Sequence, residues 1–356
     1  MRTRLLGLAF GICLAGQAAS QPVEAPALRE AMAATATQLL ETVAGGAGPI
    51  EQMAGFNRAE RMVFAADDPQ RTNWQYWPAA RVGLSLGLMT NEQRRLTHEL
   101  LTSVLSSNGY LKAVQIMQLD EILAFTDEAG FPRSMDHYAL AIFGEPSLDR
   151  DWAWRFEGHH VSLNVAVGTN QLTVTPSFFG SNPAEVQTGP LTGLRVHGIV
   201  EDMARELVDS LDARQRRSAI ISDRAPGEIL TTQLRAPRER WDAWIEAVQP
   251  EGVAVAGLNE VQQHWVRAIV AEAVANYRGE IADPITAEID VADLSFAWMG
   301  STARGQPHYF RLQGDDFVFE YDNVQNDGNH VHSVWRSKSS DFGGDTLLSH
   351  YRAAAH

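Results

Sequence analysis

The hydrophobic pattern of this chain changes its period along the sequence, and this change limits the folds open to it. In the first third, apolar residues recur every three to four positions, as in "EQRRLTHELLTSVLS", which Thr90 and Gln93 precede as a capping box. From about 137 to 179, and again from about 294 to 336, apolar and polar residues alternate, which predicts strands. Strands in two blocks without regular strand–helix alternation predict an α+β fold, in which the helical N-terminal third packs on a mostly antiparallel sheet.

The pattern also places individual elements. Helices are expected over 27–44, from Thr90 to a stop at Asn108-Gly109, over 111–127, and at about 197–220, 238–248 and 258–278. Strands are expected over 137–143, 154–167, 171–179, 294–301, 308–314, 316–323 and 330–336. Gly168-Thr169-Asn170 should join two of them as a hairpin, and the aromatic segment 71–81, interrupted by Pro78, should be a loop.

The first twenty residues have the pattern of a secretory signal peptide. Arg2 and Arg4 precede an apolar run, and Ala18-Ala19-Ser20 is a small-residue cleavage site. We therefore expect residues 21–356 to form one α+β domain that is periplasmic or secreted after cleavage near Ser20. No segment approaches the roughly 20 apolar residues that a membrane-spanning helix requires, so no membrane insertion is expected.

Composition narrows the chemistry. The only cysteine, Cys13, lies in the expected signal peptide, so the mature chain would have no disulfide, thiol nucleophile or thiolate ligand. Any bound metal must then use imidazole, carboxylate or carbonyl ligands. The formal net charge of −15 argues against nucleic acid and anionic membranes as partners and leaves a small-molecule substrate.

The segment "NHVHSVWR", residues 329–336, carries the first metal-ligand pattern. His330 and His332 are two positions apart on an expected strand, so they share one face with about 6–7 Å between Cα atoms. Glu320 lies one hairpin earlier and should come from a neighbouring strand. A carboxylate with two or three imidazoles is a ligand set that Zn, Cu, Fe and Mn sites use.

The segment "EGHHVSLN", residues 157–164, carries the second pattern. Adjacent histidines on a strand point to opposite faces unless a bulge intervenes. The face of His159 continues with apolar residues from Val161 onward, whereas His160 shares its face with the polar Ser162. We therefore predict that His160 is the ligand and that His159 is an alternate ligand or a hydrogen-bonded neighbour.

Together these segments predict one divalent transition-metal site between the two strand blocks. His160, His330 and His332 would be ligands, which requires the His160 side chain within about 5 Å of one of the others. Glu320 would be a fourth ligand or a base. Arg336 and Asp341 are candidates for catalytic positions near the site, where Arg336 would neutralise a substrate carboxylate or pair with Asp341. Such a site could serve a metal-dependent hydrolase or an oxidoreductase, and the sequence does not choose between them.

Other functions have sequence features of their own. A non-catalytic periplasmic metal- or solute-binding protein could use the same histidines, and a protein without any site could bury them as hydrogen-bonded core residues. The motif "GLSLG" around Ser85 matches a serine-hydrolase elbow, but no strand is expected before it, so small-residue packing explains it better. Tryptophans in the strand blocks would suit sugar stacking but are more often core residues.

Several long segments resemble one family. They are "RVGLSLGLMTNEQRRLTHELLTSVLS", "DWAWRFEGHHVSLNVAVGTNQLTVTPSFFGSNPAEV", "GPLTGLRV" and "FVFEYDN…HVHSVWRSKSSDFGGDTLLSHY". They are similar to the family known as domain of unknown function 3500, made of exported bacterial proteins and fungal relatives with no assigned activity. The resemblance covers nearly all of the expected mature chain. It implies export and the extent of the domain, and it implies no mechanism.

Overall fold

A computed structural model of the protein describes residues 23–44, 57–126, 130–233 and 248–344. Among these residues, no helix has both the length and the apolar character needed to cross a bilayer. The expected signal peptide lies outside the described residues, and so does nearly all of the helix expected at 238–248.

Helices and strands follow the order that the sequence predicts. The helices are α1 (Pro26–Ala44), α3 (Arg58–Met62), α4 (Asn91–Val104), α5 (Ser107–Thr126), α6 (Gly198–Ser210), α7 (Ala213–Ala219), α8 (Leu230–Gln233), α10 (Glu260–Val274) and α11 (Gly279–Glu288). The strands are β1 (Val63–Phe64), β2 (Leu84–Ser85), β3 (Ala139–Phe143), β4 (Trp152–Gly158), β5 (Val161–Val167), β6 (Leu172–Thr173), β7 (Ser177–Ser181), β8 (Ile220–Ser222), β9 (Val253–Ala254), β10 (Ser295–Gly300), β11 (His308–Gln313), β12 (Phe317–Asn323) and β13 (Val331–Ser337).

Within the described residues these strands form one 13-stranded sheet. Ten of them follow the order β1-β3-β4-β5-β7-β13-β12-β11-β10-β8, and β2, β6 and β9 pair beside this path with β3, β5 and β10. The two strand blocks meet where β7 pairs antiparallel with β13, with Gly180 opposite His332. Only the short edge pairs β1–β3 and β8–β10 are parallel in this part of the chain. The α+β class, the mostly antiparallel sheet and its assembly from two strand blocks are therefore confirmed.

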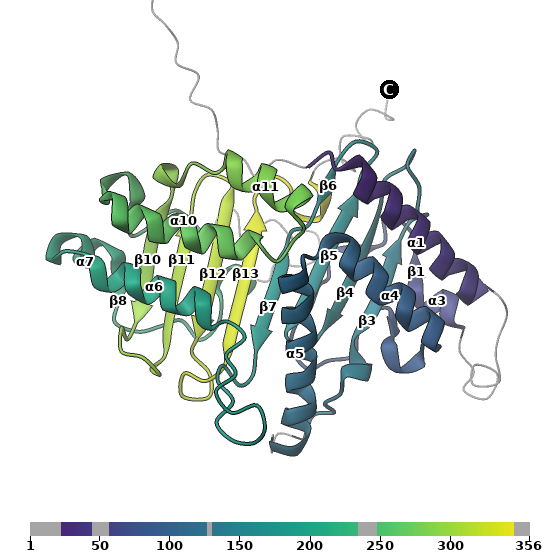
Figure 1. Ribbon diagram of the computed structural model, residues 1–356, viewed down its shortest axis with the longest axis horizontal. Helices are drawn as coiled ribbons and strands as arrows, with labels where there is room; N and C mark the ends of the chain where they lie inside the picture. The colour runs from purple at the N-terminus through teal and green to yellow at the C-terminus, as the bar shows by residue number, and fades with distance from the viewer. Residues whose placement is uncertain (1–22, 45–56, 127–129, 234–247, 345–356) are drawn as a thin grey trace, which may run out of the picture.

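The long helices cover one face of this sheet. Figure 1 shows α1, α4 and α5 over the half that contains β3, β4 and β5, and α6 and α10 over the half that contains β10 to β13. Alternate strand residues such as Leu163 and Trp335 enter one apolar core with helix residues such as Leu100 and Ile269. The helical N-terminal third therefore packs on the sheet as predicted, and α4 begins at the predicted Thr90 capping box.

The other face of the sheet is polar, yet it is also buried. Its residues include Arg311, Glu320, Asp322 and Arg336, each at most 3 % exposed. Irregular chain covers this face: the expected loop 71–81 stacks Tyr76 on Phe178 of β7 with ring centroids 4.0 Å apart, and the Tyr76 hydroxyl is 2.8 Å from that of Thr232. Charged groups between a sheet and its covering loops are shielded from water, so any site here is a closed one.

The strand expected over 154–167 is wrong as a single strand. It is a hairpin, in which Gly158 of β4 pairs with Val161 of β5 and His159-His160 form the two-residue turn. A Cβ on Gly158 would lie 2.2 Å from the Tyr138 ring, so glycine is required where the chain turns. The alternation that suggested one strand continues on both sides of the turn, and it cannot reveal the turn itself.

Three further boundaries and one short strand differ from expectation. Asn108-Gly109 does not end α4 but lies in the first turn of α5, where a Cβ on Gly109 would meet the Asn276 carbonyl at 1.9 Å. The strand expected over 171–179 is split into β6 and β7 around Pro176, which has no N–H to donate. The helix expected at 197–220 is divided into α6 and α7 because Asp212 caps a new helix. Finally, β2 places a short strand inside "GLSLG", where none was expected.

Candidate metal centre

His160 is positioned by the backbone of the β4–β5 turn. It has a left-handed conformation with φ of 65°, which is uncommon for a residue with a side chain. Its N–H donates to the Tyr76 carbonyl at 2.9 Å, and its carbonyl accepts from the Gly180 N–H at 2.8 Å. These two bonds fasten the turn to the covering loop on one side and to β7 on the other.

Gly180 makes room for the His160 ring. A Cβ at this position would lie 3.0 Å from Cδ2 of His160 and 2.7 Å from the Val331 carbonyl oxygen. Because Gly180 is paired with His332 on the neighbouring strand, the missing side chain lets an imidazole from the turn reach β13.

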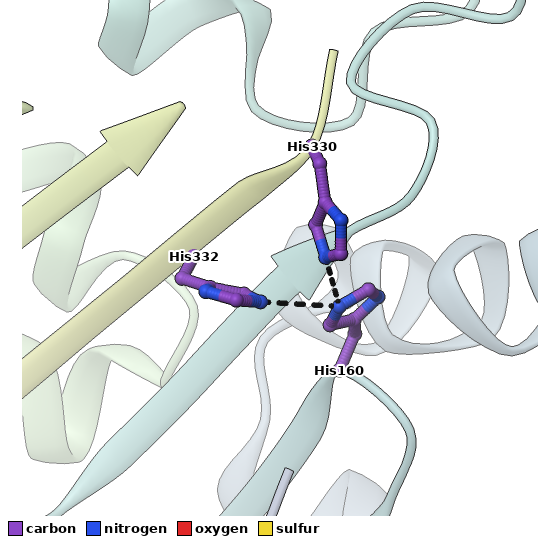
Figure 2. Close-up of side chains that lie close together, drawn as sticks. All are labelled: His160, His330 and His332. Atoms are coloured by element: carbon purple, nitrogen blue, oxygen red, sulfur yellow. Dashed lines mark hydrogen bonds between the residues drawn. The ribbon is translucent and has the colours of Figure 1, made fainter. Parts of the chain in front are cut away.

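His330 and His332 complete a group of three imidazoles. His330 directly precedes β13 and His332 lies within it, and Figure 2 shows their rings and that of His160 pointing toward one another. Nε2 of His160 is 2.7 Å from Nε2 of His330 and 3.3 Å from Nε2 of His332. Both distances are below the limit of about 5 Å that shared ligation of one ion requires. The three side chains are only 3 %, 8 % and 4 % exposed.

Two carboxylates approach His332 from the opposite side of its ring. Nδ1 of His332 donates to Oε1 of Glu228 at 2.6 Å and lies 3.7 Å from Oδ2 of Asp322. A histidine whose Nδ1–H is held by a carboxylate keeps its Nε2 lone pair available, as metal-bound histidines commonly do. Ligand atoms of Glu228, Asp322 and His332 also lie within 4.8 Å of one another.

Asp322 is the least compensated of these groups. It is 0 % exposed, and its Oδ2 faces Nδ1 of His332 at 3.7 Å, which is longer than an ordinary hydrogen bond. Burial raises its pKa to about 7, with the Glu228 charge adding to the rise and His332 opposing it. A buried carboxylate is unfavourable unless hydrogen bonds or a cation compensate its charge.

The electrostatics of the three imidazoles differ. Burial holds the pKa of His160 well below its usual range and lowers that of His330 to about 2, and the neighbouring histidines add to both shifts. Burial also disfavours the charged form of His332, but Asp322 and Glu228 outweigh it and raise its pKa to about 9. Two imidazoles are therefore neutral, the form that binds metals. His332 is protonated without a metal, so it would have to release its Nε2 proton to bind one, and the proton would be replaced by the positive charge of the ion.

Glu320 does not join this group. Its Oε1 accepts from the Leu230 N–H at 2.7 Å and from the Tyr309 hydroxyl at 2.8 Å, and its Oε2 accepts from the Thr231 N–H at 3.1 Å. The carboxylate thus caps the start of α8 and holds the covering segment to the sheet. The β12–β13 register pairs Asp322, not Glu320, with His332.

Arg336 and Asp341 form a buried ion pair away from the imidazoles. Nε of Arg336 donates to Oδ2 of Asp341 at 2.7 Å, and its Nη1 donates to the Thr231 carbonyl at 3.2 Å. Burial raises the pKa of Asp341, and Arg336 opposes this rise. Of the two predicted roles for Arg336, the geometry matches pairing with Asp341.

His159 stacks on His160 but faces a different set of groups. The two ring centroids are 3.7 Å apart. Nδ1 of His159 donates to Oδ1 of Asp120 on α5 at 2.5 Å, and Nη1 of Arg133 lies 2.9 Å from the same nitrogen. His159 therefore supports His160 from outside the group of three.

Sequence reasoning missed Glu228, Asp322 and Asp120. Asp322 alternates with Glu320 on β12, so the pattern showed that the two share a face but not which one meets His332. Glu228 lies in irregular chain before α8, and Asp120 lies within an apolar helix, so neither position carries a recognisable signal.

The role of Gly180 leads to a test. Gly180→Ala should displace the His160 ring and weaken metal binding at least tenfold, with a stability loss of about 1–3 kcal/mol from overpacking. Gly257→Ala is the control, since nothing lies within 4 Å of its added Cβ. Metal titration and thermal melting of both variants would measure the effects. Unchanged metal affinity in Gly180→Ala would show that His160 does not need this space.

The fold and the site define an α+β protein with a buried histidine–carboxylate centre on the face of its sheet that irregular chain covers. The chain belongs to the family described as "Protein of unknown function (DUF3500)", whose family model matches residues 37–344. No curated protein matches the chain, and no solved structure does either.

Proposed function

We propose that the protein binds one divalent transition metal ion through His160, His330 and His332. The observation that carries this proposal is the convergence of three buried Nε2 atoms from segments about 170 positions apart in the chain. Imidazole donors suit Zn, Cu and Fe, and a carboxylate beside them also suits Mn. Two tetrahedral ligands at Zn–N distances near 2.0–2.1 Å are about 3.3 Å apart. The His160–His332 pair is at this separation, whereas Nε2 of His160 and His330 are at the hydrogen-bonding distance of 2.7 Å and would move apart when an ion binds.

The carboxylates support the same proposal. Asp322 is buried beside His332, and burial raises its pKa to about 7 although His332 opposes the rise, so a metal ion bound at His332 would add to the compensation of its charge. Glu228 orients His332 through Nδ1, as carboxylates do for metal-bound histidines. Asp322 therefore replaces Glu320 as the proposed fourth ligand or base. Its place opposite His332 in the register supports this assignment.

A metal ion held by three imidazoles can supply Lewis-acid chemistry for hydrolysis or, if it is redox-active, electron transfer. We propose that the protein is an enzyme of one of these two kinds acting on a small molecule. The alternative is a non-catalytic metal- or solute-binding protein of the periplasm. The three histidines are at most 8 % exposed, so an enzyme, which must admit a substrate, and a carrier, which must release its ion, would both require the covering chain to open.

We further propose that the protein is exported and that residues 21–356 form one domain. The signal-peptide pattern of residues 1–20 supports export. The continuous sheet, which joins both strand blocks through β7 and β13, supports a single domain.

Elemental analysis tests the metal proposal. Protein purified from its native compartment without a histidine tag should contain close to one transition-metal ion per chain. After chelation, titration with Zn, Cu, Fe and Mn salts should restore one ion and raise the melting temperature. Protein that contains no metal, and whose melting temperature none of the four ions changes, would contradict the proposal.

A further inference from the structure

Two stretches of covering chain lie over the three-histidine group. One is the loop 72–80, from which the ring of Tyr76 contacts His332. The other is the segment 228–233, which begins at Glu228 beside His332 and ends in α8. The three histidine side chains are at most 8 % exposed, so a substrate or an ion reaches them when one of these stretches moves.

The segment 228–233 is held to the sheet by buried charged groups. The two carboxylate oxygens of Glu320 accept from the N–H groups of Leu230 and Thr231 at 2.7 and 3.1 Å. Nη1 of Arg336 donates to the Thr231 carbonyl at 3.2 Å. Hydrogen bonds to charged groups are stronger than neutral ones, and moving this segment would break three of them. We therefore expect this segment to stay in place.

The loop 72–80 is inserted into the structure through one side chain. Of its nine residues Tyr76 alone is buried, at 3 % exposed, and the others are half-buried or exposed. The Tyr76 ring stacks on Phe178 and packs edge-on against His332, with centroids 5.2 Å apart in the second pair. These contacts belong to a small apolar cluster that is separate from the main core. Segments with few buried apolar contacts are the ones that open locally.

Both ends of this loop are fixed to the sheet. Before it, Nη1 of Arg155 in β4 donates to the Gln70 carbonyl at 2.6 Å. After it, Gly83 has a φ of 121°, and a Cβ there would lie 2.6 Å from the Leu140 carbonyl oxygen, so its backbone lies directly against β3. A segment with fixed ends and one inserted side chain can move away from the sheet as a unit.

One hydrogen bond of the loop involves a charged group. The N–H of Gln75 donates to Oε2 of Glu157 at 3.0 Å. Glu157 also forms an ion pair with Arg155, in which Nε and Oε2 are 2.9 Å apart. This carboxylate therefore keeps a charged partner when the loop moves.

The loop is also connected to the backbone of a proposed ligand. The Tyr76 carbonyl accepts from the His160 N–H at 2.9 Å, and it thereby holds the turn in which His160 has its left-handed conformation. Opening of the loop would uncover His332 and release this turn in the same step.

We propose that the loop 72–80 is a lid over the three-histidine group and that Tyr76 is its latch. Opening breaks the contact of the Tyr76 hydroxyl with Oγ1 of Thr232, 2.8 Å away, and the bond to the His160 N–H, while the segment 228–233 stays on the sheet. The inference goes beyond the proposed function, because the lid gives access to the histidines whether or not they bind a metal.

Hydrogen exchange resolved to single amides tests the lid, in protein kept in chelator so that the result does not depend on a bound ion. The His160 N–H is bonded to the loop, whereas the N–H groups of Leu230 and Thr231 are bonded to Glu320. After correction for intrinsic rates, the His160 amide should exchange at least about tenfold faster than the other two. Exchange at His160 that is no faster than at Leu230 and Thr231 would overturn the proposal, because the covering chain would then open as a whole.

A buried thiol tests whether solvent enters beneath the lid. Cys13 is the only cysteine of the chain, so in a Cys13→Ser background an introduced cysteine is the only thiol. Val334→Cys places the thiol in the cluster beneath Tyr76, and Val165→Cys is the matched control in the main core. Both valines are at most 1 % exposed. Iodoacetamide should modify the Val334→Cys protein at least about tenfold faster than the Val165→Cys protein, and equal rates would contradict a lid.

Tyr76→Phe tests the latch. The variant keeps the ring and loses the hydroxyl beside Thr232, so exchange at His160 and modification of the Val334→Cys protein should both become about 2–10-fold faster, the range for one neutral hydrogen bond. Exchange at Leu230 and Thr231 should not change.

Tyr277→Phe is the matched control for the latch. Tyr277 is a buried tyrosine of the main core whose hydroxyl donates to Oγ of Ser177 at 2.6 Å, so its loss should leave the opening of the lid unchanged. Circular dichroism would verify that both variants are folded. If Tyr76→Phe changes neither rate, or speeds exchange at Leu230 and Thr231 as much as at His160, Tyr76 is not the latch of a separate lid.

Discussion

His332→Ala is expected to remove stoichiometric metal from the protein. The substitution takes away one of three converging imidazoles and leaves Glu228 and Asp322 without the group between them. The loss of a ligand should reduce affinity by well over the 10–100-fold typical of changes around the ligands. Metal content after dialysis would measure this loss. Melting temperature with and without chelator would measure the stability that the bound ion contributes.

Two control substitutions distinguish the loss of the metal site from the loss of a histidine elsewhere in the protein. His264 is exposed on α10, so His264→Ala should keep both its metal and its response to chelator. His308 of β11 is at least as buried as His332 but stacks on Trp298 of β10, so His308→Ala should lose stability while it still binds one ion. A His332→Ala protein that retains one ion per chain would mean that the three imidazoles are a structural cluster.

Asp322→Asn should have opposite effects in the two states of the protein. Without metal, burial raises the pKa of this carboxyl to about 7 although His332 opposes the rise, so its ionised form destabilises the fold and removing its charge should raise stability by about 1–3 kcal/mol near neutral pH. With metal, the same substitution removes the negative charge that the cation compensates, so metal affinity and the stability gained from metal should both fall. Denaturant unfolding in chelator and in excess metal would give the two free energies.

Asp316→Asn is the control for the opposite effects on stability that are expected of Asp322→Asn with and without metal. Asp316 is also buried, but it accepts from the Ser337 hydroxyl at 2.7 Å and from the Ser339 N–H at 2.7 Å. Removing a carboxylate that is hydrogen-bonded should lower stability with and without metal alike. If Asp322→Asn also destabilises the chelated protein, Asp322 is compensated by the protein itself, and its burial is no argument for a cation.

The local hydrophobic pattern of the sequence was sufficient to predict much of the fold. Period-two alternation located both strand blocks, and the Thr90 capping box located the start of α4. The pattern predicted wrong boundaries at Gly158 and Gly109. A glycine is needed at these positions because a ring or a carbonyl from a distant segment comes close. Those contacts depend on tertiary packing, which alternation along the chain does not record.

For the candidate site, the sequence by itself determined that His330 and His332 share one face of a strand, because that relation is a property of strand geometry. It also showed that Glu320 and Asp322 share a face. Only the tertiary structure decided which of the two acids meets His332, because this depends on the β12–β13 register and on the chain that covers the sheet.

The same holds for His160. The sequence predicted a strand at this position, but His160 lies in a turn, and the turn brings its ring to β13 only because β7 lies between them with Gly180 at the crossing point. Glu228 reaches the site from irregular chain that the sheet holds through Glu320. Local sequence determines which way a side chain points from its own strand. Which distant side chains it meets is decided by long-range strand pairing and by the packing of loops, because these contacts form only when the whole sheet is assembled.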